Sequence, residues 1–124
     1  MNKADYAASL KAQMNCCQAV LIAFADELGM DTETLMKLGS AFGSGMATTE
    51  GTCGALVGAE MVLGLCGRQP VRTQAAQLFK DFTAQCGSSV CRELKGIGTG
   101  KVLCSCEDCV RNAAAAVECM KSQE

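Results

Sequence analysis

The chain has no histidine and no tryptophan, and it contains only one tyrosine and four phenylalanines among 124 residues. The lack of histidine excludes serine–histidine and cysteine–histidine catalysis, haem held by histidine and the common catalytic zinc sites. The scarcity of aromatic side chains argues against a stacking surface for single-stranded nucleic acid. The chemistry of this chain must therefore come from sulfur, carboxylates and backbone groups.

Concentrated charge and long apolar runs are also missing. The formal net charge is −2 and both signs are mixed along the chain, so we expect no nucleic-acid partner and no polybasic contact with a membrane. Residues 1–6 lack the basic segment and apolar run of a signal peptide. The longest apolar stretch, 56–66, is interrupted by Glu60 and is too short to span a bilayer. We therefore expect a cytoplasmic protein without membrane association.

The sequence is rich in residues that pack helices closely. Hydrophobic residues make up 49% of the chain, and small or flexible side chains supply most of them. Apolar periodicity and capping residues predict helices over residues 3–28, 32–38, 52–65, 70–85, 90–95 and 106–120. We find no convincing β pattern, internal repeat or long linker. The prediction is an all-α fold, a single cysteine-rich domain over residues 1–124 that forms a compact bundle of five or six helices.

The predicted helix boundaries rest on local capping residues. Glycines placed to end helices are Gly29, Gly67, Gly87 and Gly96. Residues placed to begin the following helices are Asp31, Ser88 or Ser89, and Ser105. Residues 39–51 are predicted to form a glycine-rich loop.

Ten cysteines are present, which in a cytosolic protein more often indicates metal, cluster or redox chemistry than structural disulfides. Four of them lie in or beside the first turn of a predicted helix: Cys53, Cys91, Cys106 and Cys109. Unpaired N–H groups and the helix dipole stabilise a thiolate or a negatively charged cluster there, by about 0.3–1 kcal/mol for each helix end. The structural alternative is that small cysteines fill space between close-packed helices.

The stretch from residue 40 to residue 67 is the centre of the predicted site. It combines a glycine-rich loop with Cys53 at a helix start. Gly54 and Gly58 share one helical face without side chains, so another backbone or a bulky cofactor can approach closely.

The densest group of cysteines is Cys104, Cys106 and Cys109, which can hold one metal ion or form a redox pair. A self-contained structural zinc site normally has two such pairs, so further ligands would have to come from Cys16, Cys53 or Cys91. Other residues are interpreted as structural or incidental: Cys17, Cys66, Cys86, Cys119 and the methionines. Glu60 is expected to face solvent.

Three segments carry a resemblance to a known family: residues 15–21 (NCCQAVL), 42–46 (FGSGM) and 53–59 (CGALVGA). Further similar segments are 61–65, 89–94 and the alanine-rich helix that follows Cys109. Together they resemble the bacterial C_GCAxxG_C_C family, which is named for redox activity.

The resemblance places the recurring cysteines of the family on Cys16, Cys53, Cys91 and Cys109. The chain departs from the family in having Cys17 where alanine is common, and in the added Cys104 and Cys106. The resemblance implies redox activity, and a similar cysteine pocket in split-Soret-type cytochromes is associated with an iron–sulfur cluster. No Cys-x-x-Cys-His haem attachment is present, so the haem of those proteins is not carried over.

The leading hypothesis is a small electron-transfer or redox protein that holds an iron–sulfur cluster and exchanges electrons with a partner protein. The predicted ligands are Cys16, Cys53, Cys91 and Cys109, beside Gly54, with Cys104 and Cys106 as substitutes or additions. One alternative is a metal-free dithiol–disulfide oxidoreductase or sensor that uses Cys106/Cys109 or Cys53/Cys91. The other is a protein that binds Zn(II) or Cu(I) through thiolates. Glycine-lined faces, which pack well against other helices, also allow a homodimer.

Overall fold

The structure is a computed structural model that describes residues 1–66 and 70–122. The predicted all-α class is confirmed: the described residues contain no strand, and their only β pairing is an isolated antiparallel bridge between Thr52 and Val90. The helical segments are α1 (Lys3–Leu10), α2 (Cys16–Ala23), α3 (Ala25–Leu28), α4 (Thr32–Gly39), α5 (Gly43–Met46), α6 (Gly54–Cys66), α7 (Val71–Cys86), α8 (Cys91–Lys95) and α9 (Cys106–Ser122). The predicted number of five or six helices is therefore too small.

The largest error concerns the predicted helix over residues 3–28, which the structure divides into α1, α2 and α3. Asn15 is extended, with φ −76° and ψ 169°, and its side chain accepts a hydrogen bond from the backbone N–H of Gln18 at 2.8 Å. The Gln18 side chain accepts in return from the backbone N–H of Asn15 at 3.1 Å. This capping box begins a new helix, so Cys16 occupies the first turn of α2 and not the middle of one long helix.

Most other predicted boundaries are confirmed because their caps are local. Left-handed glycines end α3, α7 and α8; they are Gly29, Gly87 and Gly96. Asp31 caps α4 by accepting from the backbone N–H of Thr34, and Ser105 accepts from that of Asp108 at the start of α9. The predicted stop at Gly67 lies outside the described residues.

The start of α8 differs from the predicted serine cap. Its N-cap residue is Val90, whose side chain makes no capping hydrogen bond. Ser88 accepts from the backbone N–H of Val90 at 3.0 Å and donates to the Glu93 carboxylate at 2.6 Å. Ser88 thus organises the turn before α8 without capping the helix.

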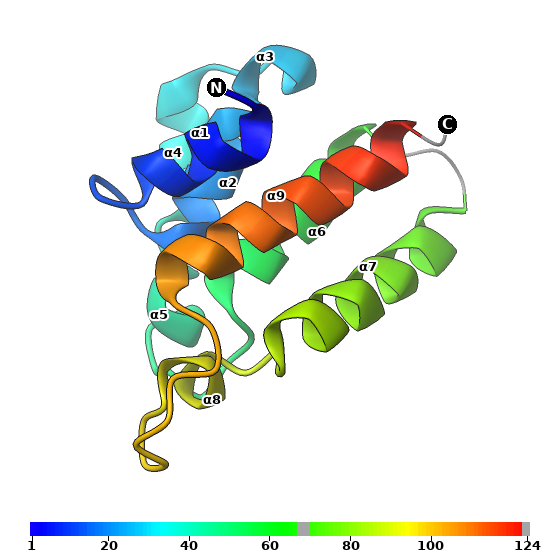
Figure 1. Cartoon of the computed structure of the whole chain (residues 1–124). Coiled ribbons are helices and arrows are strands. Elements are labelled where there is room, and N and C mark those ends of the chain that lie inside the picture. Colours follow the sequence, from blue (N-terminus) through cyan, green and yellow to red (C-terminus); the bar gives the residue numbers. More distant parts are fainter. Residues whose placement is uncertain (67–69, 123–124) are drawn as a thin grey trace.

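The helices pack around one core in which α2 and α9 both contact α6, while α1 and α7 lie against α9 (Figure 1). A Cβ atom on Gly58 would lie 2.9 Å from the backbone oxygen of Cys17, and one on Gly54 would lie 2.7 Å from that of Phe42. The predicted close approach of another backbone to this glycine face is confirmed.

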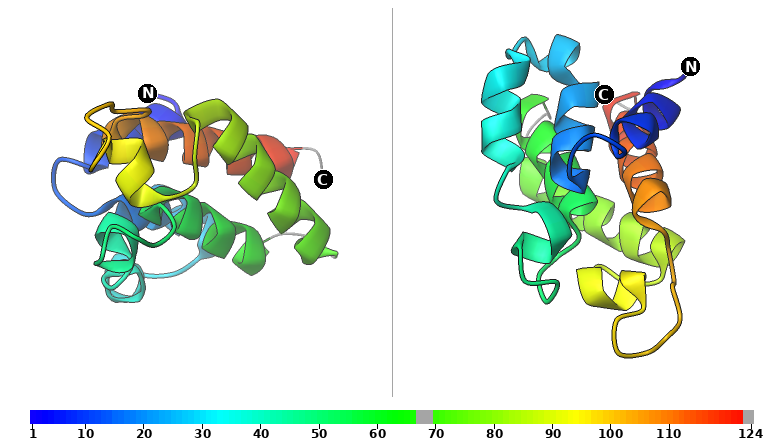
Figure 2. Two further views of the ribbon diagram at one scale, coloured as in Figure 1. Left: turned by 90° about the horizontal axis from the view of Figure 1, so that it is seen from below. Right: turned by 90° about the vertical axis from the view of Figure 1, so that its left-hand side faces the viewer.

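The two ends of the molecule differ in what they contain. The short segments α5 and α8 lie near the start of α9, at the end opposite the N-terminus and the last turns of α9 (Figures 1 and 2). Within the part of the chain that the structure describes, no helix has both the length and the apolar character needed to cross a membrane.

Candidate cysteine site

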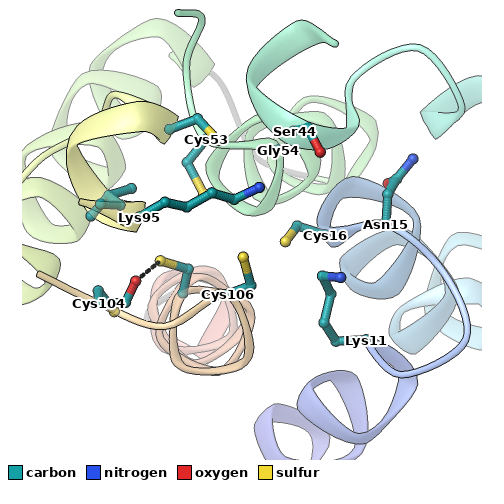
Figure 3. Close-up of a pocket in the computed structure, with 12 residues that line it drawn as sticks. Lys11, Asn15, Cys16, Ser44, Cys53, Gly54, Lys95, Cys104 and Cys106 are labelled. Carbon is teal, nitrogen blue, oxygen red and sulfur yellow. Dashed lines mark hydrogen bonds between the residues drawn. The ribbon is translucent and has the colours of Figure 1, made fainter. Parts of the chain in front are cut away.

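A cavity of about 40 Å³ lies where α2, α6 and α9 begin, beside α5 and α8. One water needs roughly 10–15 Å³ on the same measure, so the space suits an ion or a compact group better than a large planar cofactor. The lining residues are Lys11, Asn15, Cys16, Ser44, Cys53, Gly54, Cys91, Leu94, Lys95, Cys104, Cys106 and Cys109. The structure thus brings all seven sequence-predicted site residues to one place, from four separate segments of the chain (Figure 3).

Helix starts supply most of these sulfur atoms. Cys91 and Cys106 are the first residues of α8 and α9, and Cys109 lies in the first turn of α9. Cys53 directly precedes α6 and its carbonyl accepts from the backbone N–H of Val57. The predicted placement of these four cysteines at helix starts is confirmed, and the division of the first helix adds Cys16 as a fifth.

The environment of Cys53 favours a thiolate. Hydrogen bonding from the Cys109 thiol lowers the pKa of Cys53, and the backbone N–H groups of Ala55 and Leu56 lower it further, against the opposing effect of burial. The same contact with Cys53 raises the pKa of Cys109, which therefore holds the proton of the pair. A helix N-terminus stabilises negative charge on Cys53, as its position in the sequence predicted.

The glycine-rich loop positions Cys91. The backbone N–H of Cys91 donates to the carbonyl of Gly51 at 3.0 Å, and that of Arg92 donates to the carbonyl of Thr49 at 2.8 Å. Gly45 has φ +62°, and a Cβ atom there would lie 2.5 Å from the Cβ of Cys91. Only glycine permits both the left-handed backbone and this close contact, so the loop is a structural part of the site.

Cys16 and Cys106 form a close pair between two lysines. The Cys16 thiol donates a hydrogen bond that lowers the pKa of Cys106 to about 6, and the nearby charges of Lys95 and Lys11 add to the lowering. Figure 3 shows both lysine side chains reaching toward these two sulfurs. This part of the cavity therefore favours an anionic sulfur with positive charge around it.

A second group consists of Cys86, Cys104 and Cys109, whose Sγ atoms all lie within 4.8 Å of one another, an arrangement that could hold a metal ion. The side-chain amide of Asn112 donates to the sulfur of Cys86 at 3.4 Å and to that of Cys104 at 3.9 Å. Hydrogen bonding from Cys109 lowers the pKa of Cys86 to about 6, whereas burial raises the pKa of Cys104 to about 11.

Cys86 is the site residue that sequence reasoning missed, because it was interpreted as structural or incidental. It ends α7, so its approach to Cys104 and Cys109 depends on how α7 packs against α9. The signal available in the sequence was the five-residue spacing to Cys91 across the turn at Gly87. Asn112 was also missed, although it lies three residues after Cys109 and therefore on the same helical face.

The remaining predictions about polar and sulfur-containing side chains have different outcomes. Cys17 is fully buried in the core, and burial raises its pKa to about 12. Cys66 donates to the carbonyl of Val62, and Cys119 is exposed on α9; neither lines the cavity. The expectation that Glu60 faces solvent is wrong. It is half-buried, its Oε1 atom finds no hydrogen-bond partner among the described residues, and burial raises its pKa to about 7.

In comparison with known protein families, a family model matches residues 14–120 of the chain. Comparisons with curated proteins and with solved structures give no match. The matched region contains every cysteine described above as well as the glycine-rich loop. The chain therefore belongs to the C_GCAxxG_C_C family, whose description is "Putative redox-active protein".

Proposed function

We propose that this protein is a small electron carrier whose cysteine cavity holds an iron–sulfur cluster. The observation that carries the proposal is the convergence of six cysteines, from separate segments, on one small cavity. Thiolates are the usual ligands of such clusters, and the cavity offers no histidine as a competing donor because the chain has none. The donor set therefore fits the group.

The ligands in this proposal are Cys16, Cys53 and Cys91, with a fourth from α9. Cys109 contacts Cys53 and Cys106 contacts Cys16, so α9 can supply either sulfur. The half-buried Cys104 is an additional sulfur donor. When bound, the cluster would supply one-electron transfer.

The surrounding residues would set the reduction potential. The N–H groups of Ala55 and Leu56 stabilise negative charge on the sulfur of Cys53, and Lys11 and Lys95 do the same near Cys106. Hydrogen bonds and positive charge favour the reduced, more negative state and so raise the potential.

We place the contact with a redox partner protein at the start of α9. Cys104 and Cys106 are only partly buried, whereas Cys16, Cys53, Cys91 and Cys109 are buried. The cytoplasm is the compartment we propose, because the seven clustered cysteines are outside disulfides and a reducing environment keeps them so.

The test is anaerobic purification followed by visible absorption and by iron and sulfide analysis of the wild type, Cys53→Ser and Cys119→Ser. We expect a brown protein with iron and acid-labile sulfide that dithionite bleaches. Cys53→Ser should lose both elements while circular dichroism shows retained helicity, and Cys119→Ser, at an exposed position on α9, should keep them. A Cys53→Ser protein with unchanged iron, or a wild type that stays colourless after reconstitution, would contradict the proposal.

The contact between Cys16 and Cys106 favours a second candidate, a metal-free dithiol–disulfide protein. The Cys106 thiolate would attack the disulfide of a partner protein, breaking that S–S bond and forming a mixed disulfide. Attack by Cys16 on the Cys106 sulfur would then form the Cys16–Cys106 bond and release the partner as a dithiol, which has gained two electrons and two protons. This pair differs from the two pairs expected from sequence. Reversible loss of two thiols on oxidation, in iron-free protein, would support it; retention of all thiols would oppose it.

A further inference from the structure

We propose that Cys86, Cys104 and Cys109 form a separate three-thiolate site for a single Cu(I) ion, with Asn112 as its positioning residue. This inference goes beyond the proposed cluster and does not depend on it. If both sites are occupied, Cys104 and Cys109 belong to the three-thiolate site and Cys106 is the ligand that α9 supplies to the cluster.

The spacing of the three sulfurs fits one ion. At a metal–sulfur distance of about 2.3 Å, three ligands arranged around one ion stand roughly 4.0 Å apart. The Sγ atoms of Cys86, Cys104 and Cys109 already lie within 4.8 Å of one another, so small side-chain movements suffice. An iron atom of a cysteine-held cluster keeps bridging sulfides among its four ligands and takes at most two cysteines. Three cysteines around one point therefore indicate a mononuclear site.

The number and softness of the donors select the ion. Within the described residues, the metal-ligating side chains that meet this mutual spacing are these three cysteines. Structural Zn(II) normally takes four ligands, whereas a purely thiolate set favours Cu(I) among soft ions. The half-buried Cys104, between the buried Cys86 and Cys109, provides a route of entry.

Asn112 offsets the charge that such a site collects. Three thiolates around Cu(I) leave a net negative charge in a largely buried place. The first turn of α9, a helix of 17 residues, favours this charge near Cys109. Cys86 instead ends α7, where the helix dipole opposes an anion, and the Asn112 amide donates to its sulfur at 3.4 Å.

The experiment titrates Cu(I) anaerobically into the full chain in competition with a coloured Cu(I) chelator. Cys86→Ser should hold one Cu(I) fewer than the wild type at high affinity, while the matched control Cys66→Ser should hold the same number. Asn112→Leu, which keeps the size but removes the donor, should keep the number and weaken the binding by about 10- to 100-fold. Equal copper binding by Cys86→Ser and wild type would overturn the proposal.

Two further measurements separate this site from the cluster. X-ray absorption on the copper-loaded wild type should show three sulfurs around copper, whereas two sulfurs would overturn the three-thiolate assignment. This measurement needs no variant, so it tests the site even if Cys86→Ser does not fold. Cys91 is a proposed cluster ligand but not a copper ligand, so Cys91→Ser should lose the iron and keep the high-affinity Cu(I). If the wild type itself contains no iron, the copper titration still tests the three-thiolate site. Retention of Zn(II) at these thiolates after addition of equimolar Cu(I) would overturn the choice of ion.

Discussion

The same three helices build two different ends of this molecule. At the cysteine end, the first turns of α2, α6 and α9 meet α5 and α8 around the cavity. At the aliphatic end, the later turns of the same helices continue the apolar core, and α1 packs against α2 and α9 (Figure 1). The buried residues change accordingly, from Cys16 and Cys53 at the starts of α2 and α6 to Val62 and Leu63 near the end of α6.

This difference shows that stability and chemistry occupy different parts of one set of helices. Apolar burial at the aliphatic end stabilises the fold in any redox state. The cysteine end contains thiols that find partners mainly in one another. It also carries left-handed residues without the freedom of glycine, namely Ser44, Met46, Ala47 and Thr49. Each of these costs about 1–2 kcal/mol, which the surrounding contacts must offset.

The largest effect is expected from a cavity at the aliphatic end. Leu63 is fully buried, so Leu63→Ala should lower the free energy of unfolding by about 2–5 kcal/mol, measured by urea denaturation. Metal content per folded molecule should not change, because Leu63 does not line the cysteine cavity. A large loss of bound metal in the folded variant would show that packing at the aliphatic end controls metal binding at the cysteine end, which contradicts the separation of stability and chemistry.

The next prediction compares a glycine at the start of α6 with one near its end. Gly54→Ala would place a Cβ atom 2.7 Å from the backbone oxygen of Phe42, and the resulting overpacking should cost about 1–3 kcal/mol. Gly64→Ala is the matched control at the other end of the helix, with nothing within 4 Å of its added Cβ. That substitution should stabilise the protein by about 0.5–1 kcal/mol, because alanine favours a helix interior. Equal effects of the two substitutions on urea unfolding would remove the evidence for tight packing at the cysteine end.

The parts of the fold that could be predicted are those that depend on neighbouring residues. Gly29, Gly87 and Asp31 mark helix ends because their capping geometry is local. The break before Cys16 was also local, since Asn15 and Gln18 have the spacing of a capping box. It was missed because the apolar pattern runs on through residues 11–15 and imitates one long helix.

The parts of the site that could not be predicted depend on packing over long distances. Cysteines at helix starts were recognised from the sequence, and the structure brings them around one cavity. Cys86 joins Cys104 only because α7 returns along α9, which no local pattern specifies. Lys11 and Lys95 reach the same cavity from a turn and from α8, so the spacing of the cysteines could not predict that these two positive charges lie beside the sulfurs.

A smaller effect is expected from the cap that holds Cys16 in place. Asn15→Ala removes the side-chain oxygen that caps α2 and the amide that donates to the Gly39 carbonyl at 3.2 Å. We expect a loss of about 1 kcal/mol in the free energy of unfolding. Asp31→Ala, at the exposed cap of α4, should cost a similar amount but leave metal binding unchanged. Asn15→Ala should weaken metal binding, because it loosens Cys16; unchanged binding would show that the cap serves stability alone.

The smallest effect concerns Glu60, a half-buried carboxyl on α6. Burial raises its pKa to about 7 from the ordinary 4.5, so the unfolded chain releases this proton at lower pH than the folded protein. The contribution of the protonated Glu60 to the free energy of unfolding is therefore fully present below pH 4.5 and is lost as the pH rises through about 7. Glu60→Gln has no proton to release, so its stability relative to wild type should increase across that window in urea unfolding at several pH values. The thiols titrate alike in both proteins and cancel in the difference. If the stabilities of wild type and Glu60→Gln ran parallel with pH, Glu60 would release its proton equally readily in the folded and unfolded states. The folded protein would then hold a half-buried negative charge on α6 at neutral pH, as it holds thiolates at the cysteine end.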